Sequence, residues 1–271
     1  MNELSGKIGF IGAGNMASAL INGLVNSNHD PKKIIASSPE EEHLLKLSSG
    51  LGIKTTQDNL SVVKTSDIVI LAIKPNIIEA VLSEIKEEVK KKDILILSIA
   101  AGVKIAKIES ILGNTTRIFR AMPNTPASIM MGVTAISGNK SASSEDREKA
   151  KLLFECVGKV TEVKEDEIDI FTALIGSGPA YVFYLIESLL SSSSKFSLPE
   201  EEKVKLISSM IEGAAKLVSI SEDSPEILRN KVTSPGGVTQ KAIEEFEKHK
   251  LKQIIEKSME SAEKRSIELG K

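Results

Sequence analysis

The 271-residue sequence has no tryptophan, one cysteine and only 3% aromatic residues. The single cysteine, Cys156, excludes an intramolecular disulfide and a CxxC metal or redox pair. We therefore expect a small, buried thiol in a reducing compartment, and no metal site. The first residues, Met1–Lys7, lack the apolar core of a secretory signal, so the sequence favours a cytoplasmic location.

An excess of charge of one sign is also missing, with 35 Lys and Arg against 37 Asp and Glu. Lysines are scattered among glutamates, so no basic stripe is available for a phosphate backbone and we expect no nucleic-acid partner. The uncharged run Ile170–Ile186, which is rich in apolar residues, is short for a bilayer span and contains Gly-Ser-Gly-Pro, so we expect no membrane insertion.

Apolar runs alternate with helical stretches over residues 1–165. Asp67–Ile73 and Asp93–Ile99 are near-continuous apolar runs, typical of parallel strands covered on both faces. Between them, Asn76–Lys92 has apolar residues four apart, which predicts a helix. Further strands are predicted at 7–11, 34–37, 117–121, 133–137 and 159–163. The alternation predicts a Rossmann-type α/β domain with a doubly wound parallel sheet.

The strand signal disappears after residue 165. Helices are predicted at 166–192, with an interruption at Gly176–Pro179, and at 199–220, 239–247 and 251–269. We therefore expect a second, all-helical domain over residues 166–271. The helix Phe171–Leu190 is apolar nearly all round and needs burial on every side. Because a small helical domain cannot supply that cover, the sequence predicts an obligate homodimer through this domain.

The segment Gly12–Ala17 follows the first strand and opens a helix, as a G-x-G-x-x-A dinucleotide fingerprint does. Gly12 permits the tight turn, Gly14 lets the backbone approach a pyrophosphate, and Ala17 lets the helix pack closely on the strand. Amides at the helix start then face the phosphates. A glycine-rich turn without a ligand has the same local pattern, but the strand–turn–helix context favours a dinucleotide.

The second strand ends at Ser37 and Ser38, with no carboxylate to bind the ribose 2′-hydroxyl of NAD. Two hydroxyls there can donate to a 2′-phosphate, which favours NADPH; the alternative is that both serines are ordinary loop residues. No arginine is present to select the phosphate, so use of NADH stays open. Ala72–Pro75 and Ile99–Ala101 follow later strands, at the edge where open sheets bind ligands. For Lys74 the alternative is a solvated loop lysine.

Six segments, taken together and in order, resemble pyrroline-5-carboxylate reductase. They are IGAGNMA at 11–17, SDIVILAIKP at 66–75, SIAAGV at 98–103, MPNTPA at 122–127, GSGPAY at 176–181 and VTSPGGVTQKAI at 232–243. The first two are shared widely among Rossmann reductases, whereas GSGPAY and VTSPGG are far more specific to the family. The segments cover nearly the whole chain. Val238 stands where many members have threonine, so any role there is expected of its backbone alone.

The resemblance implies reduction of 1-pyrroline-5-carboxylate to L-proline by hydride from NAD(P)H, the last step of proline biosynthesis. It also implies a dimer of interlocked C-terminal helices, often built into larger rings such as a decamer. Cofactor contacts are implied at Gly12, Ala13, Gly14, Asn15, Met16, Ala17, Ser38, Asn59, Ala72, Ile73, Lys74, Pro75, Ile99, Ala100 and Ala101. The substrate carboxylate is expected at the backbone of Gly237, Val238 and Thr239, near Glu222 of a partner subunit.

Thr239 is the candidate catalytic residue, because its hydroxyl could bind the ring nitrogen of a cyclic imine. The alternative is an N-cap, a position that threonine favours. Two other functions compete with the reductase. A β-hydroxyacid-type dehydrogenase would need a lysine on the helix Asp169–Leu190, which has none. A protein that senses NADP(H) without chemistry would have no use for the Pro-Gly-Gly-Val-Thr segment.

Overall fold

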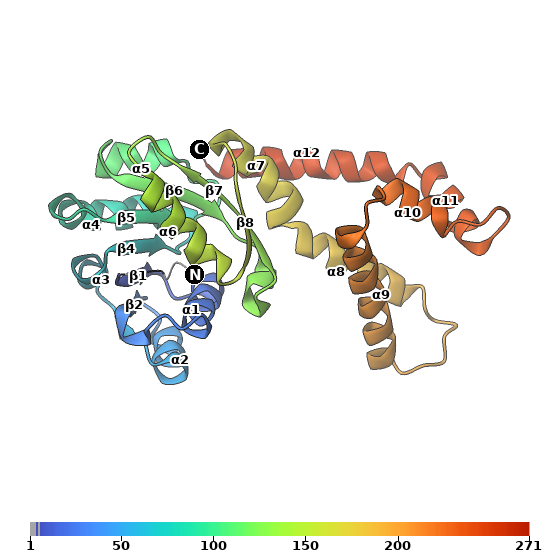
Figure 1. Ribbon diagram of the computed structural model, residues 1–271, viewed down its shortest axis with the longest axis horizontal. Coiled ribbons are helices and arrows are strands. Elements are labelled where there is room, and N and C mark those ends of the chain that lie inside the picture. The colour runs from blue at the N-terminus through green and yellow to red at the C-terminus, as the bar shows by residue number, and fades with distance from the viewer. Residues whose placement is uncertain (1–3, 5, 271) are drawn as a thin grey trace. The chain divides into compact units, whose positions relative to one another are not determined.

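Eight strands build one sheet in the computed structural model, which describes residue 4 and residues 6–270. The strands are β1 (Ile8–Ile11), β2 (Ile34–Ser37), β3 (Lys54–Thr56), β4 (Ile68–Leu71), β5 (Leu95–Ser98), β6 (Arg117–Met122), β7 (Gly132–Gly138) and β8 (Gly158–Glu162). Their order in the sheet is β3-β2-β1-β4-β5-β6-β7-β8 (Figure 1). The first six follow the doubly wound dinucleotide-binding order, which confirms the predicted fold class.

One pair of neighbouring strands departs from a parallel sheet. β6 and β7 are antiparallel, with Phe119 opposite Gly138, whereas the other neighbouring pairs are parallel. A parallel connection needs a crossover of a dozen or more residues, usually with a helix. Only a short link that contains the 3-10 helix Thr125–Ile129 joins these two strands, so the chain turns straight back.

Helices cover both faces of the sheet (Figure 1). The helices of this part are α1 (Asn15–Asn26), α2 (Glu41–Leu51), α3 (Asn59–Thr65), α4 (Ile78–Lys91), α5 (Ile105–Leu112) and α6 (Ser144–Glu155), with 3-10 helices at Pro31–Lys33 and Pro75–Ile77. Buried residues of α1, α2 and α6 join one apolar cluster, and those of α3, α4 and α5 join the other. Two covered faces explain why the strands read as continuous apolar runs.

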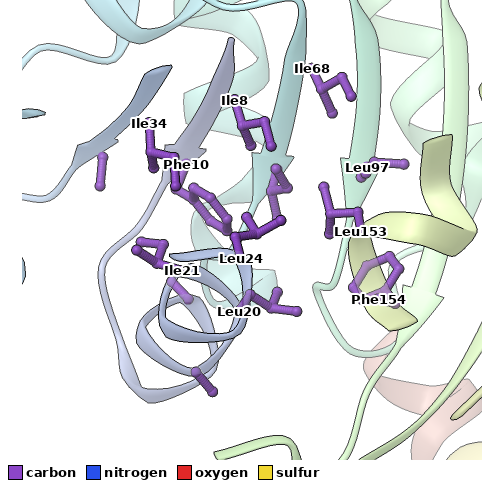
Figure 2. Close-up of a cluster of buried hydrophobic side chains, with 14 of the residues drawn as sticks. Ile8, Phe10, Leu20, Ile21, Leu24, Ile34, Ile68, Leu97, Leu153 and Phe154 are labelled. Atoms are coloured by element: carbon purple, nitrogen blue, oxygen red, sulfur yellow. The ribbon is translucent and has the colours of Figure 1, made fainter. Parts of the chain in front are cut away.

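Successive strand residues divide between these two clusters. Ile8 and Phe10 of β1 belong to the cluster with α1, whereas Ile11 belongs to the opposite cluster. Figure 2 shows Leu20 and Leu24 of α1 beside the strand side chains on the first face. The buried residues of α1 therefore form the face that holds this helix on the sheet.

In the described part of the chain after β8, the regular elements are all helices. They are the 3-10 helix Glu165–Glu167, α7 (Ile168–Phe171), a π-helical turn (Thr172–Gly176), α8 (Gly178–Ser191), α9 (Glu200–Ile220), α10 (Pro225–Lys231), α11 (Val238–Lys248) and α12 (Leu251–Leu269). The interruption predicted at Gly176–Pro179 is present as the π turn and a break at Ser177. The short helix α10 is an element that the apolar periodicity did not predict.

By its contacts the chain divides into two compact units, Met1–Pro179 with Ser261–Lys271, and Ala180–Glu260. The first unit continues past the predicted boundary at 165 because Ile168 and Asp169 are buried and α7 packs on β6 and β7. The end of α12 belongs to the same unit, since the Ser266 hydroxyl donates to Asp169 Oδ1 at 2.8 Å.

The second unit leaves its apolar side chains uncovered. The structure describes every residue of Ala180–Glu260, and none of them is buried. Phe183 and Tyr184 of α8 are 62% and 71% exposed. Among the described residues, one helical stretch, Glu165–Ser191, is long and apolar enough to cross a membrane by length and composition alone.

Candidate functional site

The turn after β1 has a backbone that only glycine can adopt at its first position. Gly12 has φ +103°, and an added Cβ would lie 2.2 Å from the Ala72 carbonyl oxygen. Its amide donates to Ser37 O at 2.8 Å, and the Ala72 amide donates to Ile11 O at 2.8 Å. The turn is thus fixed between the ends of β2 and β4, and α1 starts immediately beyond it.

The start of α1 offers free amides to an anion. Gly14 is the N-cap without a side-chain cap, and the first turn, Asn15–Ala17, carries no acidic residue. The first-turn amides of a helix have no partner within the helix, and the helix dipole favours negative charge there. No heavy atom lies within 4 Å of a Cβ added to Gly14, so a ligand can approach the backbone. Ala13 and Ala17 are buried, and the turn fits a pyrophosphate.

The two serines after β2 have different surroundings. Ser37 is fully buried, and its hydroxyl lies 2.7 Å from Asn59 Oδ1 and 3.4 Å from Phe10 O. Asn59 in turn donates to Glu84 Oε2 at 2.9 Å. Ser38 Oγ accepts from the Glu40 amide at 3.1 Å, and accepting leaves the Ser38 proton free to donate. Ser37 therefore positions Asn59, and Ser38 is the serine placed to donate to a 2′-phosphate.

The two remaining predicted cofactor segments lie at the same edge of the sheet. β4 and β5 are neighbours, and Ala72–Pro75 and Ile99–Ala101 follow their carboxyl ends. The Ile99 amide donates to Leu71 O at 3.1 Å, which holds the second segment beside the first. Lys74 is exposed. Because β1 lies between β2 and β4, with β3 beyond β2, the segments that follow these strands and β5 lie along one edge of the sheet, the edge where open α/β sheets bind ligands.

Asn124 of the MPNTPA segment is a buried residue to which the sequence pattern assigned no role. Its side chain donates to Ile175 O at 3.2 Å and accepts from the Val133 amide at 2.9 Å. A Cβ added to Gly176 would lie 3.1 Å from the Met122 methyl carbon. MPNTPA and the start of GSGPAY thus pack on each other, and Asn124 satisfies a carbonyl at the π-helical turn. π turns of this kind are frequent at functional sites.

The Pro-Gly-Gly-Val-Thr segment opens α11 within Ala180–Glu260. Gly237 is the N-cap, Val238 is the first helical residue and Thr239 the second. The N-cap alternative for Thr239 is therefore wrong, because the chain enters the helix two residues earlier. Thr239 is exposed, and among the described residues its hydroxyl forms no hydrogen bond. Val238 is 90% exposed, so its side chain packs on nothing within the chain.

The turn before α11 is held by its own polar groups. The Gly236 amide donates to Gln240 Oε1 at 2.6 Å, and the Gly237 amide donates to Ser234 O at 2.9 Å. The amides of the first turn of α11 are left without helical partners and can bind a carboxylate. Glu222 is exposed in the loop between α9 and α10, and no hydrogen bond joins it to these residues in the described part of the chain.

The histidines and the cysteine lie away from both segments. His43 pairs with Glu40 at 2.6 Å and His249 with Glu245 at 3.6 Å. Burial lowers the pKa of His29, whose Nδ1 lies 3.1 Å from Leu4 O. Cys156 is partly buried, whereas the sequence predicted a buried thiol; this partial burial still raises the pKa of the thiol to about 12, which disfavours a role as a nucleophile. Among the described residues, no three His, Cys, Asp or Glu side chains gather as a metal site would require.

Comparisons with known proteins match both parts of the chain. A family model described as pyrroline-5-carboxylate reductase dimerisation matches residues 165–269, and one described as NADP oxidoreductase, coenzyme F420-dependent, matches residues 7–102. The chain is 37% identical to the pyrroline-5-carboxylate reductase of Methanosarcina acetivorans over 266 residues, which cover 98% of each protein.

Two solved structures are similar over the full length of both chains. The pyrroline carboxylate reductase of Plasmodium falciparum, solved with NADP bound, has a TM-score of 0.91 at 31% identity. The pyrroline-5-carboxylate reductase of Coxiella burnetii has a TM-score of 0.91 at 37% identity. Both structures cover 100% of this chain and are covered by it completely.

Proposed function

The chain belongs to the pyrroline-5-carboxylate reductase family, and we propose that it reduces 1-pyrroline-5-carboxylate to L-proline with NADPH. The observation that carries this proposal is the presence of two complementary sites in one chain. A dinucleotide turn free of acidic residues is followed by a helix start with open amides and an exposed threonine. A protein that only senses a nucleotide would not need the second site, at the start of α11.

The dinucleotide supplies a hydride when it is bound, and the chain supplies its position. The amides of Asn15–Ala17 would hold the pyrophosphate, and Ser38, with Asn59 beside it, would bind the 2′-phosphate. Ala72–Pro75 and Ile99–Ala101 would bind the nicotinamide half. These segments share one rigid sheet edge, which limits the entropy lost when the two reactants are brought together.

The start of α11 binds the other reactant. The backbone of Gly237, Val238 and Thr239 binds the substrate carboxylate at the positive end of the helix dipole. The amides of Val238 and Thr239 donate to it, because the Gly237 amide already donates to Ser234 O. The Thr239 hydroxyl bonds to the ring nitrogen and orients the C=N carbon toward the hydride. When the dinucleotide is bound, its hydride would go to that carbon. The neutral imine nitrogen, which accepts the Thr239 hydrogen bond through its lone pair, would take up protons from solvent and end as the protonated amine of proline. Because solvent can protonate a secondary amine, no strong acid is needed, which suits a segment without histidine.

The chain works as a homodimer in this proposal, built from residues 166–271, with residues 1–165 as the dinucleotide domain. The exposed apolar side chains of α8 need a second surface, and the matched dimerisation family supports another copy as that surface. A lipid surface is disfavoured, because the π turn and the break at Ser177 interrupt helical bonding in the apolar stretch. Glu222 of one subunit lies near the substrate of its partner, and larger rings such as a decamer are built from these dimers.

We further propose that the enzyme is cytoplasmic and has neither a nucleic-acid nor a membrane partner. The test is the oxidation of NADPH by the purified chain, followed at 340 nm, upon addition of 1-pyrroline-5-carboxylate, with proline identified as the product. A 2-hydroxy or 3-hydroxy acid with NADP serves as the control substrate for the dehydrogenase alternative. Nucleotide binding without turnover would contradict the reductase and favour the sensor. Sedimentation should find a dimer or larger; an active monomer would contradict the assembly.

A further inference from the structure

The end of α12 contacts the loop that follows β5. A Cβ added to Gly270 would lie 2.1 Å from the Gly102 carbonyl oxygen, and one added to Gly102 would lie 2.9 Å from the Gly270 nitrogen. The two backbones therefore touch with no side chain between them. Gly102 is buried and follows directly on Ile99–Ala101, the segment assigned above to the nicotinamide half of the dinucleotide.

The same short segment also borders the other nicotinamide loop. Leu269 lines a hollow together with Pro75 and Asn76 at the start of the helical stretch that leads into α4. Pro75 closes the segment Ala72–Pro75. Residues 266–270 thus contact the loop at Gly102 and line a hollow with the other loop, although more than half of the sequence separates them from both.

A buried ionic cluster holds this segment in place. Ser266 is buried, and its hydroxyl donates to Asp169 Oδ1 at 2.8 Å. Arg120 of β6, 1% exposed, donates to the same carboxylate oxygen at 3.1 Å. Figure 1 shows α7, which carries Asp169, beside the end of α12. Separating Arg120 from Asp169 would leave a buried charge without a partner, which is energetically costly. The ion pair therefore stays formed, and the hydrogen bond from Ser266 to Asp169 restrains the end of α12.

The cluster also fixes the far end of the loop. Glu165 Oε1 accepts from the Ile105 amide at 2.6 Å, at the first residue of α5. Its oxygen lies 3.7 Å from Arg120 Nη1. Glu165 thus fixes Ile105, shortly after the Ile99–Val103 loop, and Gly270 contacts the loop itself at Gly102. Arg120 interacts with Glu165 directly and is connected to the segment of Gly270 through Asp169 and Ser266.

We propose that residues 266–270 are a positioning element for the Ile99–Val103 loop and thereby set the affinity of the chain for NADPH. The inference rests on the proposed function, because it takes Ile99–Ala101 as a nicotinamide contact. None of residues 266–270 touches a reacting atom. They restrict the conformations of the loop in the free protein, so that the binding of the dinucleotide costs less conformational entropy. α12 begins in the dimerisation region, so one helix serves both assembly and the cofactor loop.

The decisive variant is Gly270→Ala, whose new methyl group would meet the Gly102 backbone and displace either the loop or the segment. We expect NADPH to bind at least tenfold more weakly, measured by the fluorescence of the nucleotide on titration. KM for NADPH should rise in step while kcat at saturating NADPH stays near wild type. Gly50→Ala is the matched control, because no heavy atom lies within 4 Å of its added Cβ. Its NADPH affinity should be unchanged.

Ser266→Ala provides a second, milder variant that leaves the Gly102–Gly270 contact in place, and it should also weaken NADPH binding.

Thermodynamic linkage adds a test on the wild-type chain. If the docked segment favours NADPH binding, NADPH must favour the docked state of the segment by the same factor. Amide hydrogen exchange in residues 266–270 should therefore slow when NADPH is added. Wild-type affinity in folded Gly270→Ala, or exchange unaffected by NADPH, would overturn the inference. A chain that shows both effects but leaves pyrroline-5-carboxylate unreduced would overturn the proposed function alone.

Discussion

Replacement of Thr239 by valine removes one hydroxyl and keeps the shape of the side chain. Thr239 is the second residue of α11, is exposed, and forms no hydrogen bond among the described residues. Valine and threonine have similar helix propensities, so the free energy of unfolding should change by less than about 0.5 kcal/mol. A loss of the positioned donor should lower kcat/KM by about 10²-fold, which corresponds to about 2.7 kcal/mol of transition-state stabilisation.

The assay compares steady-state kinetics with the thermal unfolding midpoint for the same preparations. Thr239→Ser keeps the hydroxyl and should retain most of the activity, whereas Val238→Ala removes a side chain with no predicted contact and should leave kcat/KM near wild type. NADPH affinity should be unaltered in all three variants. Near-normal turnover in Thr239→Val would remove Thr239 from the mechanism and leave the segment only its backbone amides.

Three further predictions follow from the dinucleotide turn, the end of β2 and the partly buried thiol. Gly12→Ala should cost about 1–3 kcal/mol in unfolding free energy, because φ is +103° there, and should abolish measurable NADPH binding; Gly50→Ala should do neither. Ser38→Asp should repel a 2′-phosphate and move the NADPH to NADH ratio of kcat/KM toward NADH; an unchanged ratio would contradict the role of Ser38. With its pKa raised to about 12, Cys156 should resist iodoacetamide at pH 8 until the chain unfolds, and the stability that its neutral thiol contributes should be lost as pH rises from about 9 toward 12.

The sequence pattern was most informative where burial is two-sided and local. β4 and β5 were predicted from their near-continuous apolar runs, and every one of their residues is buried. β3 was missed for the opposite reason: Lys54–Thr56 is a short, polar strand at the sheet edge, and its existence depends on pairing with β2. β7 was predicted as a strand at 133–137, but its antiparallel direction was not, since strand direction follows from the link to β6 and leaves no periodic signal.

The site shows the same division. Gly12 to Ala17 is a local motif whose geometry follows from its own residues, and the structure places each as the fingerprint requires. The pairing of Ser37 with Asn59 joins the end of β2 to the first residue of α3 and cannot be seen in either segment alone. Arg120 did leave a signal: a second arginine inside an apolar strand implies a buried charge, and a buried charge implies a partner. The partner, Asp169, lies 49 residues away and could not be named.

The contact of Gly270 with Gly102 is the extreme case, because neither residue belongs to a periodic pattern. Glycine at the end of a helix is ordinarily explained by its C-terminus, and Gly102 by the turn that follows β5. Each local explanation is sufficient for its own glycine, so the sequence gives no reason to expect a contact between the two residues. The close approach of the two backbones shows that each glycine also satisfies a distant constraint. Substitution at Gly270 therefore separates the explanations: helix termination alone predicts a small change in stability, whereas contact with the loop predicts a change in NADPH affinity.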